Sequence, residues 1–403
     1  MSRPVLRKSR LFRRATRAFM LGALVALLAA CSSADNAPAT TAKLSSPAEV
    51  QVPLDGSLVT ADATWAVVEM GHLDQLANTF WQLFVLHRGD SRWSLVTPPG
   101  FADNGGLVAT SAKGTSLVTG FQANQLNHFS PVAASSDGGK TWAPGVLGQG
   151  IADVPDAMAA SITGKVLALV GRPASSVLWS VGNLSDWQTL ASEKSIASSP
   201  ISRGCAVTSI TAVSFVSGGQ PIVGATCSHA GNVGIFEYAD GTWRSFAPRL
   251  LTSISHATTQ VLRLTSSSGI VSAIIAARTG SHTVLFAARL FPGQSHWAVS
   301  GALNVPKSAQ VLSSGTSSGG GVFVALSSGT SESVEVEATF NGSWTQLPVV
   351  PKGTETVAFS ENGRVDALVS SGSVLTDYTL DVSQRRWRQS QVVKVPIQYG
   401  SSN

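Results

Sequence analysis

The residue types that most often carry chemistry are spread along this chain of 403 residues. Its seven histidines lack the H-x-H and H-x₃-H spacings typical of metal ligands, and they do not cluster with cysteines or carboxylates. They are His72, His87, His128, His229, His256, His282 and His296. The sequence has no phosphate-binding loop and no dinucleotide fingerprint after a strand. It therefore predicts no metal site, no cofactor and no catalytic residue of these classes.

Residues 315–319 match G-x-S-x-G, the pattern of a serine nucleophile. That pattern has catalytic meaning only between a strand and a helix. Here it lies in SSGTSSGGG, a Ser- and Gly-rich stretch typical of a hairpin turn. We interpret it as a turn without a catalytic role.

Cys205 and Cys227 are the only cysteines after Cys31. They flank two apolar segments separated by residues 217–220, which read as two strands around a turn. Antiparallel pairing of the strands would bring the two cysteines within bridging range, and exported compartments allow disulfides. The sequence predicts a disulfide here, with two free buried thiols as the alternative.

Residues 1–30 are typical of a secretory signal peptide. A basic segment precedes an apolar run over residues 19–30, which is too short for a membrane span of about 20 residues. Cys31 follows Leu28-Ala29-Ala30, an order that resembles a bacterial lipobox, in which the cysteine is acylated and becomes the N-terminus. An ordinary signal peptide with an incidental cysteine is the alternative. Residues 31–50 are then a lipidated cysteine and a flexible tether, small, polar and Pro-containing.

The charge distribution excludes a nucleic-acid partner. The formal charge is +5, but residues 1–30 hold seven of the 28 basic residues and no acidic residue. From Cys31 onward, 21 basic residues face 23 acidic ones. A nearly neutral body with scattered charge lacks the basic patch that DNA or RNA binding needs.

Tryptophan recurs with a period that decides the fold class. The spacings between seven of the ten tryptophans are 49, 45, 56, 54, 47 and 43 residues, with a mean of 49. Most of the seven follow a turn-like stretch such as Asp-Gly-Thr or Asn-Gly-Ser. They are Trp93, Trp142, Trp187, Trp243, Trp297, Trp344 and Trp387. A repeat of about fifty residues is typical of a propeller or solenoid.

Each period has room for about four short strands, rich in Val, Thr and Phe and separated by Gly, Ser and Asn. Four-stranded sheets repeated radially are the blades of a β-propeller. We predict an all-β chain in which residues 51–403 form a seven-bladed β-propeller of four antiparallel strands per blade, with six or eight blades as alternatives. Residues 72–84 read as a loop entering a strand, with a short helix as the alternative.

Residues 135–142 read SSDGGKTW and match S-x-D-x-G-x-T-W at every position. In such a turn, Ser and Asp side chains bind nearby backbone N–H groups, Gly supplies an unusual dihedral angle and Trp packs into the blade. The residues are Ser135, Asp137, Gly139, Thr141 and Trp142. The motif resembles the Asp box, or BNR repeat, of propellers related to sialidases and photosystem assembly factors. In that superfamily the motif is structural, so the resemblance implies the fold of residues 51–403 and no chemistry.

The resemblance also raises sialidase activity, which needs an arginine triad, a Tyr–Glu nucleophile pair and an Asp acid/base. Bidentate arginines are the physical means of holding a carboxylate. The leading Arg segment of such enzymes is missing, and Arg172-Pro173 is its nearest fragment. Tyr238 follows Glu237 directly, and strand neighbours point to opposite faces. A glycosidase with a divergent site is retained as the alternative function.

The sequence as a whole predicts an exported lipoprotein, anchored through Cys31 and facing the extracytoplasmic side of a bacterial membrane. Its predicted function is non-catalytic binding or assembly, as a monomer, with a protein or glycan partner whose identity the sequence does not give. Loops carry most of the contacts on a closed ring of blades. The longest candidate loops are residues 70–79, 122–130 and 196–204.

Overall fold

The structure is a computed structural model. It divides into two units, Met1–Glu49 and Val50–Asn403, and the described residues all belong to the second. Cys31 and the predicted tether therefore lie outside the described residues. The structure describes residues 56–395 except 61, 72–78, 99–106, 112–116, 122–131, 146–154, 162, 172–174, 182–183, 185, 251–253, 308, 318, 329–333, 340–341 and 361.

The described strands pair in antiparallel sets that follow one another along the chain. Blade 1 contains β1 (Gly56–Val59), β2 (Ala63–Gly71), β3 (Thr79–His87) and β4 (Ser94–Leu95). Blade 2 contains β5 (Leu107–Ser111), β6 (Leu117–Phe121), β7 (Val132–Ser135) and β8 (Ala143–Gly145). Blade 3 contains β9 (Pro155–Ala160), β10 (Lys165–Val170), β11 (Ser176–Val181) and β12 (Gln188–Ser192).

Four further sets complete the described fold. Blade 4 contains β13 (Val207–Phe215), β14 (Pro221–Cys227), β15 (Gly234–Ala239) and β16 (Thr242–Ser245). Blade 5 contains β17 (Thr258–Ser267), β18 (Ile270–Thr279), β19 (His282–Leu290), β20 (Ala298–Val299) and β21 (Leu303–Val305). Blade 6 contains β22 (Ala309–Thr316), β23 (Val322–Ser328), β24 (Val334–Thr339) and β25 (Trp344–Gln346). Blade 7 contains β26 (Thr354–Phe359), β27 (Val365–Ser371), β28 (Val374–Asp381) and β29 (Arg386–Lys394).

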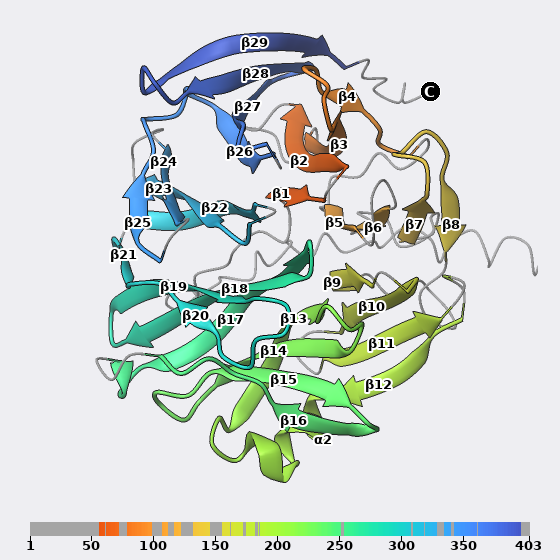
Figure 1. Ribbon diagram of the computed structural model, residues 1–403, viewed down its shortest axis with the longest axis vertical. Coiled ribbons are helices and arrows are strands. Elements are labelled where there is room, and N and C mark those ends of the chain that lie inside the picture. The colour runs from red at the N-terminus through yellow and green to blue at the C-terminus, as the bar shows by residue number, and fades with distance from the viewer. Residues whose placement is uncertain are drawn as a thin grey trace, which may run out of the picture. The chain divides into compact units, whose positions relative to one another are not determined.

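The blades form a closed ring, so the predicted all-β propeller class is confirmed. Figure 1 shows β1, β22 and β26 near the centre and β8, β25 and β29 at the rim. Among the described residues, each cluster of buried apolar side chains joins two consecutive blades. A further cluster joins the last blade to the first, with Ala358 and Leu368 packed near Met70 and Phe84. The core is thus divided among the interfaces between blades.

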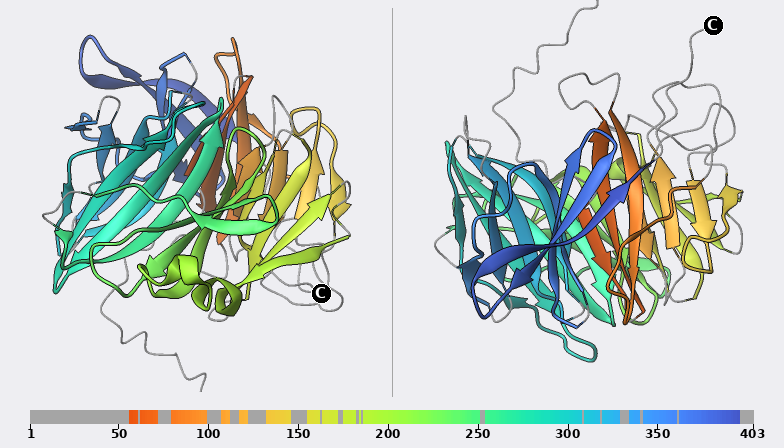
Figure 2. Two further views of the ribbon diagram at one scale, coloured as in Figure 1. Left: turned by 60° about the horizontal axis from the view of Figure 1, so that its bottom comes forward. Right: turned by 90° about the horizontal axis from the view of Figure 1, so that it is seen from above.

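Burial along each strand follows from its place in the blade. A second strand such as β18 has sheet neighbours on both sides and adjoining blades on both faces, so its sequence IVSAIIAART is almost continuously apolar. An outer strand such as β16 faces solvent, and most of TWRS is exposed. Figure 2 shows the strands of each blade running between the two ends of the ring.

The repeated tryptophan lies at the start of the outer strand in every blade, which confirms the predicted register. Its indole N–H often donates to a carbonyl just after the outer strand of the preceding blade, and so ties the blades together. These bonds are Trp142 to Val96 O, 3.1 Å; Trp297 to Phe246 O, 2.8 Å; Trp344 to Gly301 O, 2.9 Å; and Trp387 to Pro348 O, 3.1 Å. The tryptophan period therefore reflects a repeated contact between blades.

Two segments that the sequence predicts as loops can be compared with the structure. Residues 196–204 were expected to form a loop, but they contain the end of the short helix α2 (Glu193–Ala197) and the 3-10 turn η2 (Pro200–Ser202). Ser192 caps α2 by accepting from the Ser195 N–H at 3.1 Å, and Ile196 is buried beneath it. Within residues 72–84, strand β3 begins at Thr79, as the favoured interpretation predicts, while residues 72–78 lie outside the described part.

Candidate functional site

The turn between β7 and β8 has the hydrogen bonds that its sequence predicts. The Ser135 hydroxyl accepts from the Gly139 N–H at 2.8 Å. Asp137 accepts from the backbone and the hydroxyl of Thr141, at 2.9 and 2.6 Å. Gly138 has a φ of 78°, and a Cβ there would lie 2.6 Å from the His87 ring. Glycine is required for both reasons, and the turn of blade 2 packs directly on blade 1.

The hydrogen bonds to Asp137 lower its pKa to about 2, chiefly those from Thr141. We expect Asp137→Ala to reduce the melting temperature, because the backbone N–H and the hydroxyl of Thr141 both lose their acceptor. Since the pKa is lowered in the folded state, this contribution is present at neutral pH and disappears as pH falls toward 2. Thermal unfolding checks it against Asp186→Ala, an exposed aspartate before the blade 3 tryptophan. Equal melting temperatures for both variants would contradict the role.

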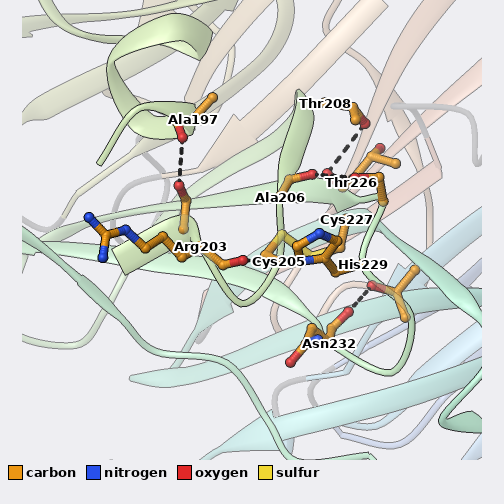
Figure 3. The surroundings of a disulfide bond; sticks show 12 residues. Ala197, Arg203, Cys205, Ala206, Thr208, Thr226, Cys227, His229 and Asn232 are labelled. Atoms are coloured by element: carbon orange, nitrogen blue, oxygen red, sulfur yellow. Dashed lines mark hydrogen bonds between the residues drawn. A yellow bond between two sulfur atoms is a disulfide. The ribbon is translucent and has the colours of Figure 1, made fainter. Parts of the chain in front are cut away.

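A disulfide joins Cys205 and Cys227, the pair that the sequence singled out, within blade 4 (Figure 3). Cys205 precedes β13 and Cys227 ends β14, and both are buried. The His229 ring contacts the Arg203 carbonyl at 3.1 Å beside them. Because the two cysteines are buried and joined to each other, we assign them a structural role.

The interface that closes the ring, between blades 7 and 1, contains a buried charge cluster. Arg364 Nε donates to Asp366 Oδ1 at 2.7 Å, and its Nη2 donates to Asp377 Oδ2 at 2.9 Å. Its Nη1 donates to the Ser91 carbonyl of blade 1 at 3.2 Å. Both aspartates are 1% exposed or less. We call these residues, with Trp93 and Gln391, the closure interface.

Gln391 makes a two-point contact across the closure interface. Its Oε1 accepts from the Trp93 N–H at 2.6 Å, and its Nε2 donates to the Trp93 carbonyl at 3.0 Å. Trp93 is 2% exposed, which makes it the most deeply buried of the repeated tryptophans in the described structure. The last described strand, β29, thus binds the first blade through one amide side chain.

Burial raises the pKa values of the two carboxylates in the closure interface. Desolvation, followed by the charge of Asp366, raises the pKa of Asp377 to about 7. Desolvation likewise raises the pKa of Asp366, against the opposing effect of Arg364. Perturbed carboxylates are often catalytic, but buried ion-pair networks produce the same shifts. Here both carboxylates point into an interface between blades, so their geometry indicates a structural role.

A second carboxylate pair lies between the same blades, at the other end of the strands. Glu355 occupies an irregular position of β26, near Glu69 of β2 and Ser370 of β27. Burial and the charge of Glu69 raise the pKa of Glu355 to about 7, from an ordinary value of 4.5. The folded protein therefore retains a proton that the unfolded chain releases between those two values.

This difference predicts how stability depends on pH. Because the folded state binds the extra proton, the contribution of Glu355 to stability is fully present below the unfolded pKa and is lost as pH rises through about 7. Asp377 acts in the same direction. We expect a higher melting temperature at about pH 5 than at about pH 8, and a smaller difference for Glu355→Gln. An unchanged pH profile in that variant, relative to the exposed control Asp186→Asn, would contradict the assignment.

A cavity of about 140 Å³, with polar and apolar surface in similar amounts, opens between blades 1 and 7, at the end of the strands that carries the Ser135–Trp142 turn. Strand ends and the turns beside them build it from three places: β1 to β2, β3 to β4, and β26 to β27. Its lining residues are Thr60, Ala63, Thr64, Leu86, His87, Arg88, Gly89, Asp90, Ser360 and Asn362. His87 belongs both to this lining and to the contact with Gly138.

The sequence did not point to this cavity. Of the three loops that it favoured, residues 196–204 connect two successive blades and therefore lie at the opposite end of the strands. Residues 72–78 and 122–130 are outside the described part of the chain. The signal available in the sequence was weak, since turn residues such as Asp90 and Asn362 occur at many turns.

Glu237 and Tyr238, which were considered for sialidase chemistry, are not brought together, and Arg172-Pro173 lies outside the described residues. Glu237 is buried and accepts from Arg244 Nε at 2.7 Å. The Tyr238 ring instead packs against Trp243, tilted by 51°, with 5.2 Å between the ring centroids. Ser317, the serine of the G-x-S-x-G match, lies in the turn from β22 to β23, and its hydroxyl accepts from the Gly321 N–H at 2.9 Å. Among described residues, no group of three metal-ligating side chains is placed to hold an ion, and no helix could cross a membrane.

The sequence matches no protein-family model and no curated protein. Similar solved structures include YCF48 bound to a D1 peptide, 14% identical, with a TM-score of 0.42 over 70% of this chain and 80% of that one. The Aleuria aurantia lectin, a six-bladed propeller, is 13% identical, with a TM-score of 0.43 over 74% and 95%. An ulvan lyase is 10% identical, with a TM-score of 0.44 over 86% and 93%. Similarity at this level concerns the fold and carries over no ligand or activity.

Proposed function

We propose that this protein is a non-catalytic binding or assembly module: an Asp-box propeller attached through lipid on Cys31 to the extracytoplasmic side of a bacterial membrane. In this proposal residues 1–30 are a signal peptide that is removed, and residues 31–50 are the lipidated cysteine and tether. The partner is a protein or a glycan, and the module acts as a monomer.

The cavity between blades 1 and 7 is the observation that carries the proposal. It is formed by turns and the strand ends beside them, and turns on a rigid scaffold are where binding residues concentrate. Its lining includes three residues with polar or charged side chains, His87, Arg88 and Asp90. A concave site with a few convergent polar groups is the usual form of a binding site.

The two aspartates of the closure interface, whose pKa values are raised, support binding without catalysis. Asp366 and Asp377 accept hydrogen bonds from Arg364, and Asp377 also accepts one from Ser390. A general acid or base must reach the reacting group of a substrate. These two aspartates instead connect strands within blade 7 and support the closure of the ring.

A paired experiment tests this function. The mature protein is incubated with sialosides and other aryl glycosides, and it is also used as bait in an envelope pull-down. We expect no turnover, together with capture of a partner that Asp90→Ala weakens and Asp186→Ala leaves unchanged. Turnover that a single Asp, Glu or Tyr substitution abolishes would overturn the binding assignment in favour of a glycosidase.

The membrane anchor is tested separately with Cys31→Ala. We expect the unsubstituted protein to sediment with membranes and the variant to lose that attachment, because acyl chains are the proposed anchor. Cell fractionation with detection of the mature chain measures it. Equal membrane attachment of the two proteins would show that the anchor is assigned to the wrong residue.

A further inference from the structure

The outer strand of blade 7 is longer than those of the other blades and presents an open edge. β29 has nine residues, whereas the described outer strands of the other blades have two to five. It is the last strand of its sheet in the described part of the chain, and Figure 1 shows it at the rim of the ring. Unpaired backbone groups along such an edge can bond to a further strand.

The direction of the backbone groups of β29 follows from one hydrogen bond just beyond its end. The Val395 N–H donates at 2.8 Å to the carbonyl of Ser373, just before β28, and the register stays regular from there to Gln391. In an antiparallel pair, hydrogen bonds to the neighbouring strand alternate along the chain. The N–H and C=O groups of Val392 and Lys394 therefore point away from β28, toward the open edge.

One face of β29 is used for ring closure, and the other face is exposed. Gln391 binds blade 1, and Val393 and Val395 pack in the cluster that joins the last blade to the first. Side chains alternate between the two faces of a strand, so those of Val392 and Lys394 lie on the other face, where both are exposed. The closure contacts therefore leave this face and the edge accessible.

The charge of this edge favours one sign of partner. Residues 381–394 contain one acidic residue, Asp381, and four basic residues, which gives a net charge of +3. The basic residues are all exposed: Arg385, Arg386, Arg388 and Lys394. Arg388 also binds Asp381 at 2.8 Å. A second copy of the chain paired along this edge would bring basic side chains together, which is destabilising, whereas an acidic strand is attracted.

We propose that the open edge of β29 binds an extended acidic segment of a partner protein, which adds to the sheet of blade 7 as a further strand. The proposal deepens the binding function above, on which it rests, by giving the chemistry of the partner. Ser390 interrupts the register of β29, so the backbone pairing is placed on residues 391–394. Main-chain bonds to Val392 and Lys394 hold the segment, and its acidic side chains contact the basic ones of the edge.

Fluorescence polarisation with the mature protein and short labelled peptides tests the proposal. The probe is a nine-residue peptide that alternates glutamate with valine. One control peptide has lysine in place of glutamate, and another has proline in place of valine, which keeps the charge but disfavours strand pairing. We expect saturable binding of the glutamate–valine peptide, no binding of the lysine peptide, and binding about fivefold weaker for the proline peptide, because backbone hydrogen bonds are lost.

Val392→Pro tests the backbone contact directly, because it removes an edge N–H that β28 does not use. We expect it to weaken binding of the glutamate–valine peptide about fivefold and to change the melting temperature little. Ser245→Pro is the matched control in β16 and should leave binding unchanged. Ser245 is exposed and its N–H also points outward, since the next residue, Phe246, donates to Ile235 O at 2.8 Å. Lys394→Gln should weaken binding about threefold.

Hydrogen exchange provides a readout that does not depend on a substitution. Bound peptide should slow exchange at the N–H groups of Val392 and Lys394 and leave that of Ser245 unchanged. Unchanged exchange at both edge residues, equal binding of a control peptide, or full binding by folded Val392→Pro would each overturn the proposal. So would a dimer in sedimentation that protects the same two N–H groups, which would assign the edge to a second copy. If the pull-down still captures a partner in those cases, the binding function stands and only the edge assignment is wrong.

Discussion

Arg364→Met is expected to lower the free energy of unfolding by about 3–5 kcal/mol, because it leaves two buried carboxylates without their cation. The Arg364 side chain is 17% exposed and bonds to both Asp366 and Asp377. Methionine preserves much of the volume, so the loss is electrostatic. Urea unfolding at about pH 8 measures it, since the carboxylates are most ionised there.

Two companion variants make this prediction specific. Arg388→Met removes a more exposed arginine of the same blade, 52% exposed and paired with Asp381, and should have a much smaller effect. Adding Asp366→Asn and Asp377→Asn to Arg364→Met should restore part of the lost stability, because the uncompensated charges are then removed. An equal loss for Arg388→Met, or no recovery in the triple variant, would contradict an electrostatic role.

Trp93→Ala is expected to cost about 3–5 kcal/mol, through a cavity that the surrounding blades cannot fill. Trp93 is 2% exposed and is enclosed between blade 1 and blade 7. The repeat provides a matched control, since Trp344 occupies the equivalent position of blade 6 but is only half buried. Urea unfolding of the two alanine variants compares them at constant residue type.

The comparison separates burial from repeat position. If repeat position alone set the contribution of a tryptophan, Trp344→Ala would cost as much as Trp93→Ala. We expect a clearly smaller effect for Trp344→Ala, which loses an indole hydrogen bond to Gly301 at 2.9 Å but opens no closed cavity. The loss of stability for Trp93→Phe should be smaller than that for Trp93→Ala, because phenylalanine retains most of the buried apolar surface.

The propeller class could be predicted from the sequence because one contact is repeated in most blades. A tryptophan at the start of the outer strand reaches back to the preceding blade, so its period follows the blade length. The turn at residues 135–142 was equally readable, since its Ser135 and Asp137 bonds span only four residues. Local hydrogen bonds of this kind are visible as spacing in the chain.

The closure interface could not be predicted in the same way. Arg364 and Ser91 are 273 residues apart, and a repeat period contains no information on what joins the first blade to the last. One sign was available: Asp366 and Asp377 interrupt apolar strands at positions that should be buried. Such positions indicate a buried polar network, but they do not identify its partners.

Each blade consists of one continuous chain segment, and this affects the order of events during synthesis. The nascent chain emerges N-terminus first, and domains begin folding before the chain is complete. Blade 1 must then expose the apolar face around Met70 and Phe84 until β26–β28 arrive to cover it. A polypeptide terminated just before β29 would keep six entire blades and yet lack Gln391, which binds the Trp93 backbone. Premature stop codons near the 3′ end of the gene should therefore yield chains that proteases remove, although most of the ring has been made.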